Sequence, residues 1–398
     1  MNEPQATDVV IVDGSRTPIG KFNGSLSGFS ATDLGGIAIA GALESSGVGA
    51  NAVDKVVMGH VLTAGEGQSA ARSAAVKGGL PLTIDAVTVN KVCLSGLQAI
   101  NYASMLLQTG QADVVLAGGM ESMSNSPHLL MKSRRGYGYG SSELVDSLQF
   151  DGLTCAIESK IMGEATDLYA MAQTIDRDSQ DAYAAQSHDR AARAIKDGVL
   201  DDEITSVSIP QRKSDPVEFN ADEGVRSGTD AASLGGLRPA FNVDGVITAG
   251  NASQLSDGAS ATIVTTRAKA EELGVDILAT LHGYGMVAGP DNCSLLHQPS
   301  RAIRAAAARA AIDVADIDLF EINEAFAAVA IGSMNELGVT DEIVNVNGGA
   351  IAIGHPLGMS GNRIALTLAH ELRRRGGGLG AAGLCGGGGQ GDALILSV

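Results

Sequence analysis

The feature that most constrains the fold is an internal repeat shared by the two ends of the chain. Each copy has a strand-like run, a Ser-Gly pair, a helix-like segment and a second strand-like run that closes on glycines. In that order, the first copy occupies residues 87–90, 95–96, 97–108 and 114–116, and the second occupies residues 344–347, 360–361, 364–374 and 379–384. The shared order and near-equal spacing predict a fold built from two copies of one unit.

Short Val- and Ile-rich runs alternate with Ala- and Leu-rich stretches of helical length, as in residues 9–12, 33–44 and 53–58. This alternation predicts βα units stacked around a mainly parallel sheet. A chain of 398 residues exceeds the size at which one hydrophobic core stops growing, and 44% of its residues are hydrophobic. We therefore predict an α/β protein with more than one domain, and exclude disordered, collagen-like and coiled-coil classes.

Residues 122–249 interrupt the alternation with Gly-rich and polar stretches, including residues 133–142 and 222–236. We interpret this segment as an insertion between the two copies of the repeat. Within it, residues 179–196 place Ala and Tyr at helical spacing between charged residues, which predicts one amphipathic helix.

Charge and cysteine spacing exclude several classes of partner. The formal net charge of −18 and the lack of a basic stripe disfavour nucleic acid. The four cysteines have neither CxxC spacing nor a histidine at zinc-ligand spacing, so we expect reduced thiols and no metal site. Residues 1–7 lack the features of a signal peptide, and no apolar run reaches the ~20 residues that span a bilayer. We expect a cytoplasmic protein without a membrane partner.

Cys93 lies between the apolar residues 87–89 and an amphipathic segment that begins at Leu97. This context predicts a sulfur at a strand-to-helix turn, where backbone N–H groups and the helix dipole favour a thiolate. A nucleophile is one interpretation of Cys93, and a buried cysteine that packs as a small hydrophobe is the other. The segment alone supports both equally.

His355 stands in the corresponding turn of the second copy, between Gly354 and Pro356. It is either a histidine held for structural reasons or a base or hydrogen-bond donor that lines a cleft. The repeat favours the second interpretation, because it brings this turn opposite Cys93.

Cys385 precedes the glycine-rich loop 386–391, which contains G-x-G-x-x-G. No helix follows this loop, so it is not a dinucleotide-binding fingerprint. Its glycines allow close approach of a substrate, and its N–H groups can stabilise an oxyanion. Packing remains the alternative for Cys385. Asn323 begins a helical stretch, where it could cap the helix or hold a water or substrate oxygen.

Four motifs in the chain resemble the signature set of the thiolase family. In order they are Asn90-x-x-Cys93-x-Ser95-Gly96, Asn323-Glu324-Ala325-Phe326, Gly354-His355-Pro356-x-Gly358-x-Ser360-Gly361 and Cys385-x-Gly387-Gly388-Gly389. They extend over nearly the whole chain, and their combination is highly specific. The resemblance implies the α/β thiolase fold, with duplicated βαβαβαββ halves in a layered arrangement and an inserted loop domain.

By this resemblance, residues 1–269 form the N-terminal half and residues 270–398 the C-terminal half. The core of the first half comprises about residues 1–121 and 250–269, and residues 122–249 form the CoA-binding loop domain. Members of the family usually assemble as dimers or tetramers, so a homo-oligomer, and in particular a homotetramer, is expected.

The resemblance also implies a role for each catalytic residue. Cys93 carries the acyl group as a thioester, and His355 is the base that activates it. Cys385 moves a proton to the leaving CoA or from the α-carbon of the second acyl-CoA. One oxyanion hole is formed by His355 with a water held by Asn323, and the other by the backbone N–H groups of Cys93 and Gly387. No permanently bound cofactor is implied.

Coenzyme A thioesters, namely acetyl-CoA and acetoacetyl-CoA, are the implied substrates. Arg226 is the expected contact for the adenine nucleotide and Ser253 for the pantetheine. The other implied substrate contacts are Ser227, Ser233, Phe241, Ala249, Leu153, Met162, Ala325 and Phe326. Because the net charge repels an anionic substrate, the CoA site must gather basic residues locally. Arg134 and Arg135 are expected in an oligomerisation loop instead.

The implied activity is that of an acetyl-CoA C-acetyltransferase of fatty acid metabolism, which condenses two acetyl-CoA reversibly to acetoacetyl-CoA and CoA. Met162, associated with short acyl chains, is retained, but Ile161 replaces a histidine that lines the pantetheine pocket of short-chain members. A degradative 3-oxoacyl-CoA thiolase of broader or longer chain specificity is therefore the alternative. Ketoacyl-ACP synthases, which have histidines at both corresponding positions and lack Cys385, fit poorly. So does a CoA-binding protein with a dead site, since all four catalytic side chains are present.

Overall fold

The computed structural model describes residues 3–290 and 292–398, so the expected first two residues of the N-terminal half lie outside the described residues. One ten-stranded sheet runs through the molecule in the order β14-β15-β16-β13-β1-β12-β5-β3-β4, with β2 paired to β12 beside this path. Its strands are β1 (Val9–Arg16), β2 (Gly20–Lys21), β3 (Lys55–Gly59), β4 (Asp85–Val89), β5 (Val114–Ser122), β12 (Ser256–Thr266), β13 (Ala279–Ala288), β14 (Leu319–Ile322), β15 (Leu379–Gly386) and β16 (Gln390–Ser397).

The helices of the described chain include the four expected from the sequence and several short ones. They are α1 (Ala31–Ser46), α2 (Ala70–Lys77), α3 (Ser95–Gln108), α4 (Met162–Ala172), α5 (Arg177–Lys196), α6 (Ala231–Gly235), α7 (Arg267–Leu273), α8 (Gln298–Ala310), α9 (Ala327–Leu337), α10 (Ala350–Ile353) and α11 (Ser360–Arg374). The predictions of helices at 33–44, 97–108, 179–196 and 364–374 are confirmed by α1, α3, α5 and α11. None of the described helices is both long enough and apolar enough to cross a membrane.

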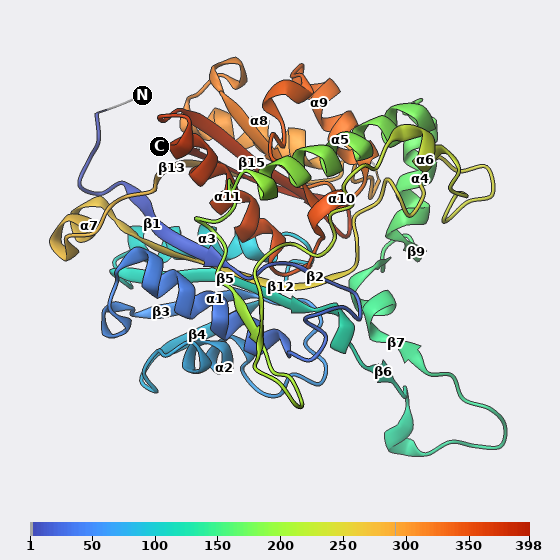
Figure 1. Ribbon diagram of the computed structural model, residues 1–398, viewed down its shortest axis with the longest axis horizontal. Helices are drawn as coiled ribbons and strands as arrows, with labels where there is room; N and C mark the ends of the chain where they lie inside the picture. The colour runs from blue at the N-terminus through green and yellow to red at the C-terminus, as the bar shows by residue number, and fades with distance from the viewer. Residues whose placement is uncertain (1–2, 291) are drawn as a thin grey trace.

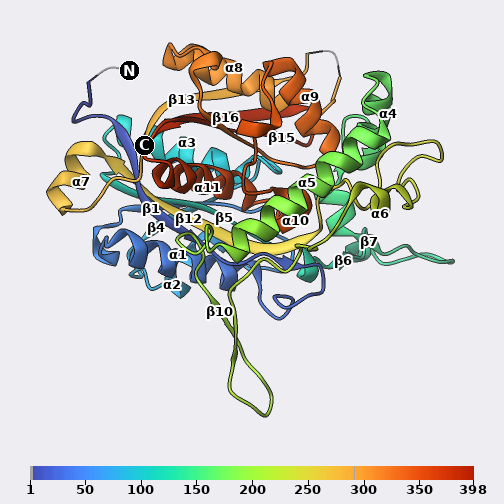
Figure 2. The same ribbon diagram turned by 45° about the horizontal axis from the view of Figure 1, so that its top comes forward.

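The elements stack in layers, as the sequence predicts (Figure 1). Helix α1 packs on β1 and β12 and against α2, while α8 packs on β13 and β16 and against α9. Helices α3 and α11 lie side by side between these two parts of the sheet (Figure 2). Their apolar faces form a fully buried cluster with β5 and β15. Each buried Leu or Ile in it contributes about 1.5–3 kcal/mol, so this central layer holds the two copies together.

The prediction of a mainly parallel sheet is wrong. Among the described strands, only the pairs β3–β4, β3–β5 and β14–β15 are parallel. The remaining pairs, which include all those of β1, β12, β13 and β16, are antiparallel. A parallel pair requires a crossover connection. The consecutive strands β15 and β16 are joined by a tight hairpin instead. The central strands run antiparallel to partners that are distant in the sequence.

Residues 344–347 do not form the predicted strand. Val344 makes only an isolated bridge with Phe320, and Asn345 has a φ of 48°, which ends an extended run. The Asn345 side chain instead pairs with the backbone of Ile322: Oδ1 accepts from its N–H and Nδ2 donates to its carbonyl, both at 2.8 Å. A side-chain amide thus replaces the backbone partner that a strand would supply.

The two Ser-Gly pairs of the repeat explain why α3 and α11 approach so closely at their N-termini. A Cβ atom on Gly96 would lie 2.7 Å from the Asn362 nitrogen and 2.8 Å from the Gly358 carbonyl oxygen. A Cβ on Gly361 would collide with the backbone nitrogen of Leu97. Only glycine allows this contact, which brings the turns before both helices together.

Two hairpins project from the layered body. One joins β6 (His128–Leu129) to β7 (Val145–Asp146), and the other joins β10 (Val207–Ile209) to β11 (Val217–Phe219) (Figures 1 and 2). A third short pair is β8 (Thr154–Cys155) with β9 (Lys160–Ile161). All three belong to the segment that interrupts the βα alternation.

Candidate active site

Cys93 lies in a tight loop between β4 and α3, as the sequence predicts. Val92 adopts a left-handed φ of 52°. The Ser95 hydroxyl closes the loop, because it accepts from the Lys91 N–H at 2.8 Å and donates to the Val92 carbonyl at 2.6 Å. The Cys93 side chain therefore stands at the N-terminal end of α3.

The backbone N–H groups at this turn favour the Cys93 thiolate, as predicted, but burial outweighs them. Burial raises the pKa of Cys93 to about 12, although the backbone N–H groups of Cys93 and Gly387 act in the opposite direction. The Glu121 carboxylate raises this pKa further. Cys93 is therefore a neutral thiol at physiological pH, and it needs a base to become a nucleophile.

His355 supplies a neutral imidazole in the turn before α11. Its Nδ1 lies 2.6 Å from the Ser360 hydroxyl, which itself donates to the Pro356 carbonyl at 2.9 Å. Because the Ser360 hydroxyl hydrogen is already used, Nδ1 must carry the imidazole proton and Nε2 must be the unprotonated acceptor. Burial, and to a smaller extent Arg363, lowers the pKa of His355 to about 3, which keeps the ring neutral.

Asn323 lies beside His355 and does not cap a helix. Helix α9 begins at Ala327, and its N-cap is Phe326, so the capping interpretation is wrong. The Asn323 Nδ2 lies 3.5 Å from the His355 Nε2. Its buried Oδ1 has no hydrogen-bond partner among the described residues. An unpaired buried oxygen costs about 1–3 kcal/mol, which favours the other interpretation, that Asn323 holds a water or substrate oxygen.

Cys385 is fully buried in β15, immediately before the β15–β16 turn. Burial raises the pKa of its thiol, and the neighbouring Cys93 sulfur raises it further. The Gly387 N–H lies close enough to Cys93 to lower the pKa of its thiol. Gly388 and Gly389 take left-handed φ values of 79° and 68°, which explains the glycines of this turn. Cys93 of the first copy therefore lies beside Cys385 and Gly387 of the second, while His355 lies beside Asn323.

A mainly apolar cavity of about 120 Å³ lies beside His355. Of the predicted substrate contacts, it is lined by Leu153, Met162, Phe241, Ser253 and Phe326, together with Ile161, which departs from the family pattern. The Phe241 and Phe326 rings meet edge to face with centroids 6.4 Å apart. The cavity can hold a short acyl group next to the imidazole.

Four predicted CoA contacts lie on exposed surface and do not line this cavity. Ser233 and Asp230 form the capping box of α6, and Ser227 and Ala249 are exposed. The exposed Arg226 donates its backbone N–H to the His188 Nδ1 at 3.2 Å. Ala325 does not line the cavity either, but its carbonyl accepts from the Ser253 N–H at 3.0 Å. Arg134 and Arg135 are exposed in the β6–β7 hairpin.

Glu121 is a buried residue of this region that the sequence reasoning missed. Its carboxylate accepts from the N–H groups of Gly358 at 2.9 Å, Leu62 at 3.0 Å and Val61 at 3.2 Å. It therefore ties the His355 turn to the loop after β3, and burial raises its pKa to about 7. The available signal was a single carboxylate within the otherwise uncharged β5, in which all nine residues are buried.

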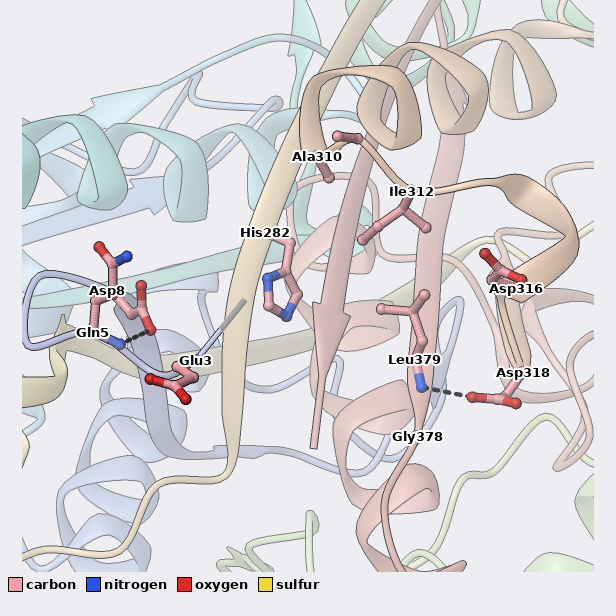
Figure 3. Close-up of a pocket in the computed structure, with 11 residues that line it drawn as sticks. Glu3, Gln5, Asp8, His282, Ala310, Ile312, Asp316, Asp318, Gly378 and Leu379 are labelled. Atoms are coloured by element: carbon pink, nitrogen blue, oxygen red, sulfur yellow. Dashed lines mark hydrogen bonds between the residues drawn. The ribbon is translucent and has the colours of Figure 1, made fainter. Parts of the chain in front are cut away.

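A larger cavity, of about 650 Å³, lies elsewhere and includes none of the predicted site residues. Figure 3 shows Glu3, Asp8, Asp316 and Asp318 around it, with His282 on its wall. Asp8 and Asp318 are held by the N–H groups of Gln5 and Leu379, both at 2.8 Å. Such an acidic surface repels anionic ligands. Across residues 3–290 and 292–398, no group of three or more His, Cys, Asp or Glu could hold a metal ion.

Known proteins resemble the whole chain. Residues 9–268 match the family model of the thiolase N-terminal domain, and residues 275–398 that of the thiolase C-terminal domain. A protein of Mycolicibacterium smegmatis described as a probable acetyl-CoA acetyltransferase is 58% identical over 387 residues, which cover 97% of this chain and 100% of that protein. The acetyl-CoA acetyltransferase of Cupriavidus necator is 49% identical over 98% of this chain and 99% of its own. The crystal structure of the Bacillus anthracis acetyl-CoA acetyltransferase has a TM-score of 0.95 at 39% identity, over 98% of each chain.

Proposed function

The chain belongs to the thiolase family, and we propose that it condenses two acetyl-CoA reversibly to acetoacetyl-CoA and CoA. Two observations support this proposal: the Cys93 and Cys385 thiols are neighbours, and the neutral His355 imidazole lines a small apolar cavity. The names of the relatives support acetyl-CoA as the substrate. An acyltransferase of this kind needs no permanently bound cofactor, because CoA thioesters supply both reacting groups.

In the first half-reaction, the His355 Nε2 takes the proton of the Cys93 thiol, and the sulfur attacks the carbonyl carbon of acetyl-CoA. The negative charge that develops on the carbonyl oxygen is held by the N–H groups of Cys93 and Gly387. CoA then leaves with a proton from Cys385, so an acetyl thioester on Cys93 and a Cys385 thiolate remain. The depressed pKa of His355 and the raised pKa of Cys93 oppose the first transfer, so it requires the developing thioester oxyanion to be stabilised.

In the second half-reaction, the Cys385 thiolate removes the α-proton of a second acetyl-CoA. The enolate oxygen is held by His355 and by a water bound to Asn323, whose free Oδ1 supports this role. The enolate carbon attacks the acetyl thioester, the bond to Cys93 breaks, and His355 returns its proton to the Cys93 sulfur. Each N–H or imidazole donor to such an oxyanion is worth about 10²- to 10³-fold in rate.

We propose that residues 122–249 form the CoA-binding loop domain, between a core at residues 1–121 and 250–269 and the half formed by residues 270–398. Exposed Arg226, Ser227, Ser233 and Ala249 would then contact the nucleotide end of CoA along the surface, and Ser253 the pantetheine near the cavity. The positive charge of Arg226 supports this orientation in a chain of net charge −18. The need for two free thiols favours a reducing compartment, the cytoplasm.

The cavity predicts a preference for short substrates. In thiolysis, we expect a higher kcat/KM for acetoacetyl-CoA than for longer or 2-methyl-branched 3-oxoacyl-CoA, because Met162 and Phe326 leave little room beside His355. Replacing Met162 with Ala should enlarge the cavity and raise the relative kcat/KM for a six-carbon substrate by about 10-fold or more.

Val217→Ala, in the exposed strand β11, is the control and should leave this ratio unchanged. Clear preference of the unaltered protein for long chains would contradict the proposal and support the degradative alternative.

We further propose a homo-oligomer that pairs through the edge strand β4. This edge exposes unpaired backbone groups, and the side chain of Val87 is 49% exposed. The nearby α3 presents Tyr102 and Met105, which are also exposed. Exposed Leu130, Met131 and Leu144 in the β6–β7 hairpin support further assembly into a tetramer.

Replacing Val87 with Lys is expected to shift the assembly to smaller species, because each copy would place a charge at the paired edge. Light scattering after size-exclusion chromatography measures the mass directly. Val217→Lys in β11, which is similarly exposed, should have no effect. A monomeric unaltered protein would rule out the oligomer.

A further inference from the structure

The two backbone N–H groups that lower the pKa of Cys93 come from different parts of the chain that pack directly on one another. One belongs to the loop after β4, and the other, of Gly387, belongs to the β15–β16 turn. A Cβ on Gly386 would lie 2.6 Å from the Leu94 Cγ, and a Cβ on Gly387 would lie 3.4 Å from a Val92 methyl group. The distance between the two N–H donors therefore depends on how these two segments are held together.

An ion pair between a partly exposed lysine and a buried aspartate joins the same two segments. The Lys91 Nζ lies 2.7 Å from Oδ1 and 2.9 Å from Oδ2 of Asp392, which is completely buried. The Tyr284 hydroxyl donates to the Asp392 Oδ2 at 2.7 Å, and Lys91 also donates to the Gln98 side-chain oxygen at 3.1 Å. Each side-chain nitrogen or oxygen of Lys91 and Asp392 thus has a hydrogen-bond partner, and these bonds fix the geometry of the ion pair.

Both members of the pair lie close to the N–H donors along their own segments. Lys91 is two residues from Cys93 in the loop closed by Ser95. In the hairpin, Asp392 pairs with Leu384, and Cys385 pairs with Gly391. The Gln390 side chain donates to the Gly387 carbonyl at 3.1 Å, which connects the register of β16 to the turn. A shift of Asp392 would therefore move Gly387.

We propose that Lys91 and Asp392 are positioning residues that set the spacing between the Cys93 and Gly387 N–H donors of the oxyanion hole. This inference rests on the proposed function, since it concerns the same site and the same acetyl-enzyme. Neither side chain touches the reacting atoms. Their effect is geometric, and misplacement of donors by about 1 Å can cost on the order of 10²-fold in rate.

The test uses Lys91→Met, Asp392→Asn and the double variant in the full-length protein. We expect each single variant to lower kcat by about 10- to 100-fold, with KM for acetyl-CoA changed less than about threefold. The double variant should lose no more than the worse single variant, because both remove one shared interaction.

Infrared spectroscopy of the enzyme acylated with carbonyl-labelled acetyl-CoA supplies a readout that a purely structural role would not change. Well-placed N–H donors lower the stretching frequency of the thioester carbonyl, so the variants should shift this band to higher frequency. Glu203→Gln neutralises one member of another ion pair, Arg16–Glu203 at 2.6 Å, which is buried and shares no residue with the Lys91–Asp392 pair. It should lower the melting temperature and leave both kcat and the carbonyl band unchanged.

The outcomes separate the two proposals. An acetyl-enzyme whose carbonyl band is the same in the variants as in the unaltered protein would overturn the positioning role alone. So would variants that behave like Glu203→Gln, with lower stability and full kcat. Failure of the unaltered protein to take up the acetyl label would overturn the proposed function, and this role with it.

Discussion

Replacing Cys93 with Ser is expected to abolish the acetyl-enzyme and to lower turnover by about 10⁴-fold or more, as loss of a covalent nucleophile does. A serine hydroxyl is less acidic than a thiol, and the buried neutral His355 is a weak base. The remaining groups cannot transfer the acetyl group through an intermediate. Intact-mass spectrometry after incubation with acetyl-CoA measures the covalent adduct directly.

Cys155→Ser is the matched control for this experiment. Cys155 is a buried free thiol of the same chain, but it lies in the short β8 strand and does not line the cavity beside His355. We expect this variant to acquire one acetyl group, as the unaltered protein does. A Cys93→Ser protein that still gains an acetyl thioester would contradict the assignment of Cys93 as the nucleophile.

Replacing Cys385 with Ser is expected to separate the two half-reactions. The acetyl-enzyme should still form in part, because Cys93, His355 and the Gly387 N–H remain in place. Condensation should fall by about 10²- to 10⁴-fold, the usual contribution of a general base. A serine hydroxyl is too weak an acid to form the anion that would replace the Cys385 thiolate and remove the α-proton. Mass spectrometry detects the accumulated adduct, and an optical assay of acetoacetyl-CoA measures turnover.

Exchange of the α-protons of acetyl-CoA in deuterium oxide tests the same step independently. The unaltered protein should catalyse this exchange, and Cys385→Ser should not. Cys293→Ser, a second buried thiol of the described chain, serves as the control and should retain both exchange and condensation. Normal exchange by Cys385→Ser would show that another group removes the proton.

These two expectations follow from the way in which the fold sets protonation states. Burial keeps the thiols of Cys93 and Cys385 protonated and the imidazole of His355 neutral. All three groups are therefore uncharged before substrate enters, and a proton must move within the site at each step. The helix N-terminus alone does not activate Cys93. In the proposed mechanism, activation depends on the unprotonated Nε2 of His355, a tautomer that the Ser360 hydroxyl sets.

Local patterns predicted the elements around the site well, because strand and helix periodicity depends on neighbouring residues. Helices α3 and α11 and strand β15 follow the predicted segments closely. The prediction of a strand at 344–347 was wrong because the side chain of Asn345 replaces the expected backbone pairing, and no local pattern reveals this. The prediction of a mainly parallel sheet was wrong for a similar reason, because the relative direction of paired strands depends on which distant segments become neighbours.

Residue types and their order were enough to identify the family and to select Cys93, Asn323, His355 and Cys385 as candidate catalytic residues. They also predicted α3, β5, α11 and β15 of the repeat. Tertiary structure decided the rest. The raised pKa of Cys93 and the tautomer of His355 arise from burial and from specific hydrogen-bond partners. The ion pair of Lys91 with Asp392 joins residues 301 positions apart. Desolvation and long-range contacts have no local sequence signature, so the sequence could not reveal these features.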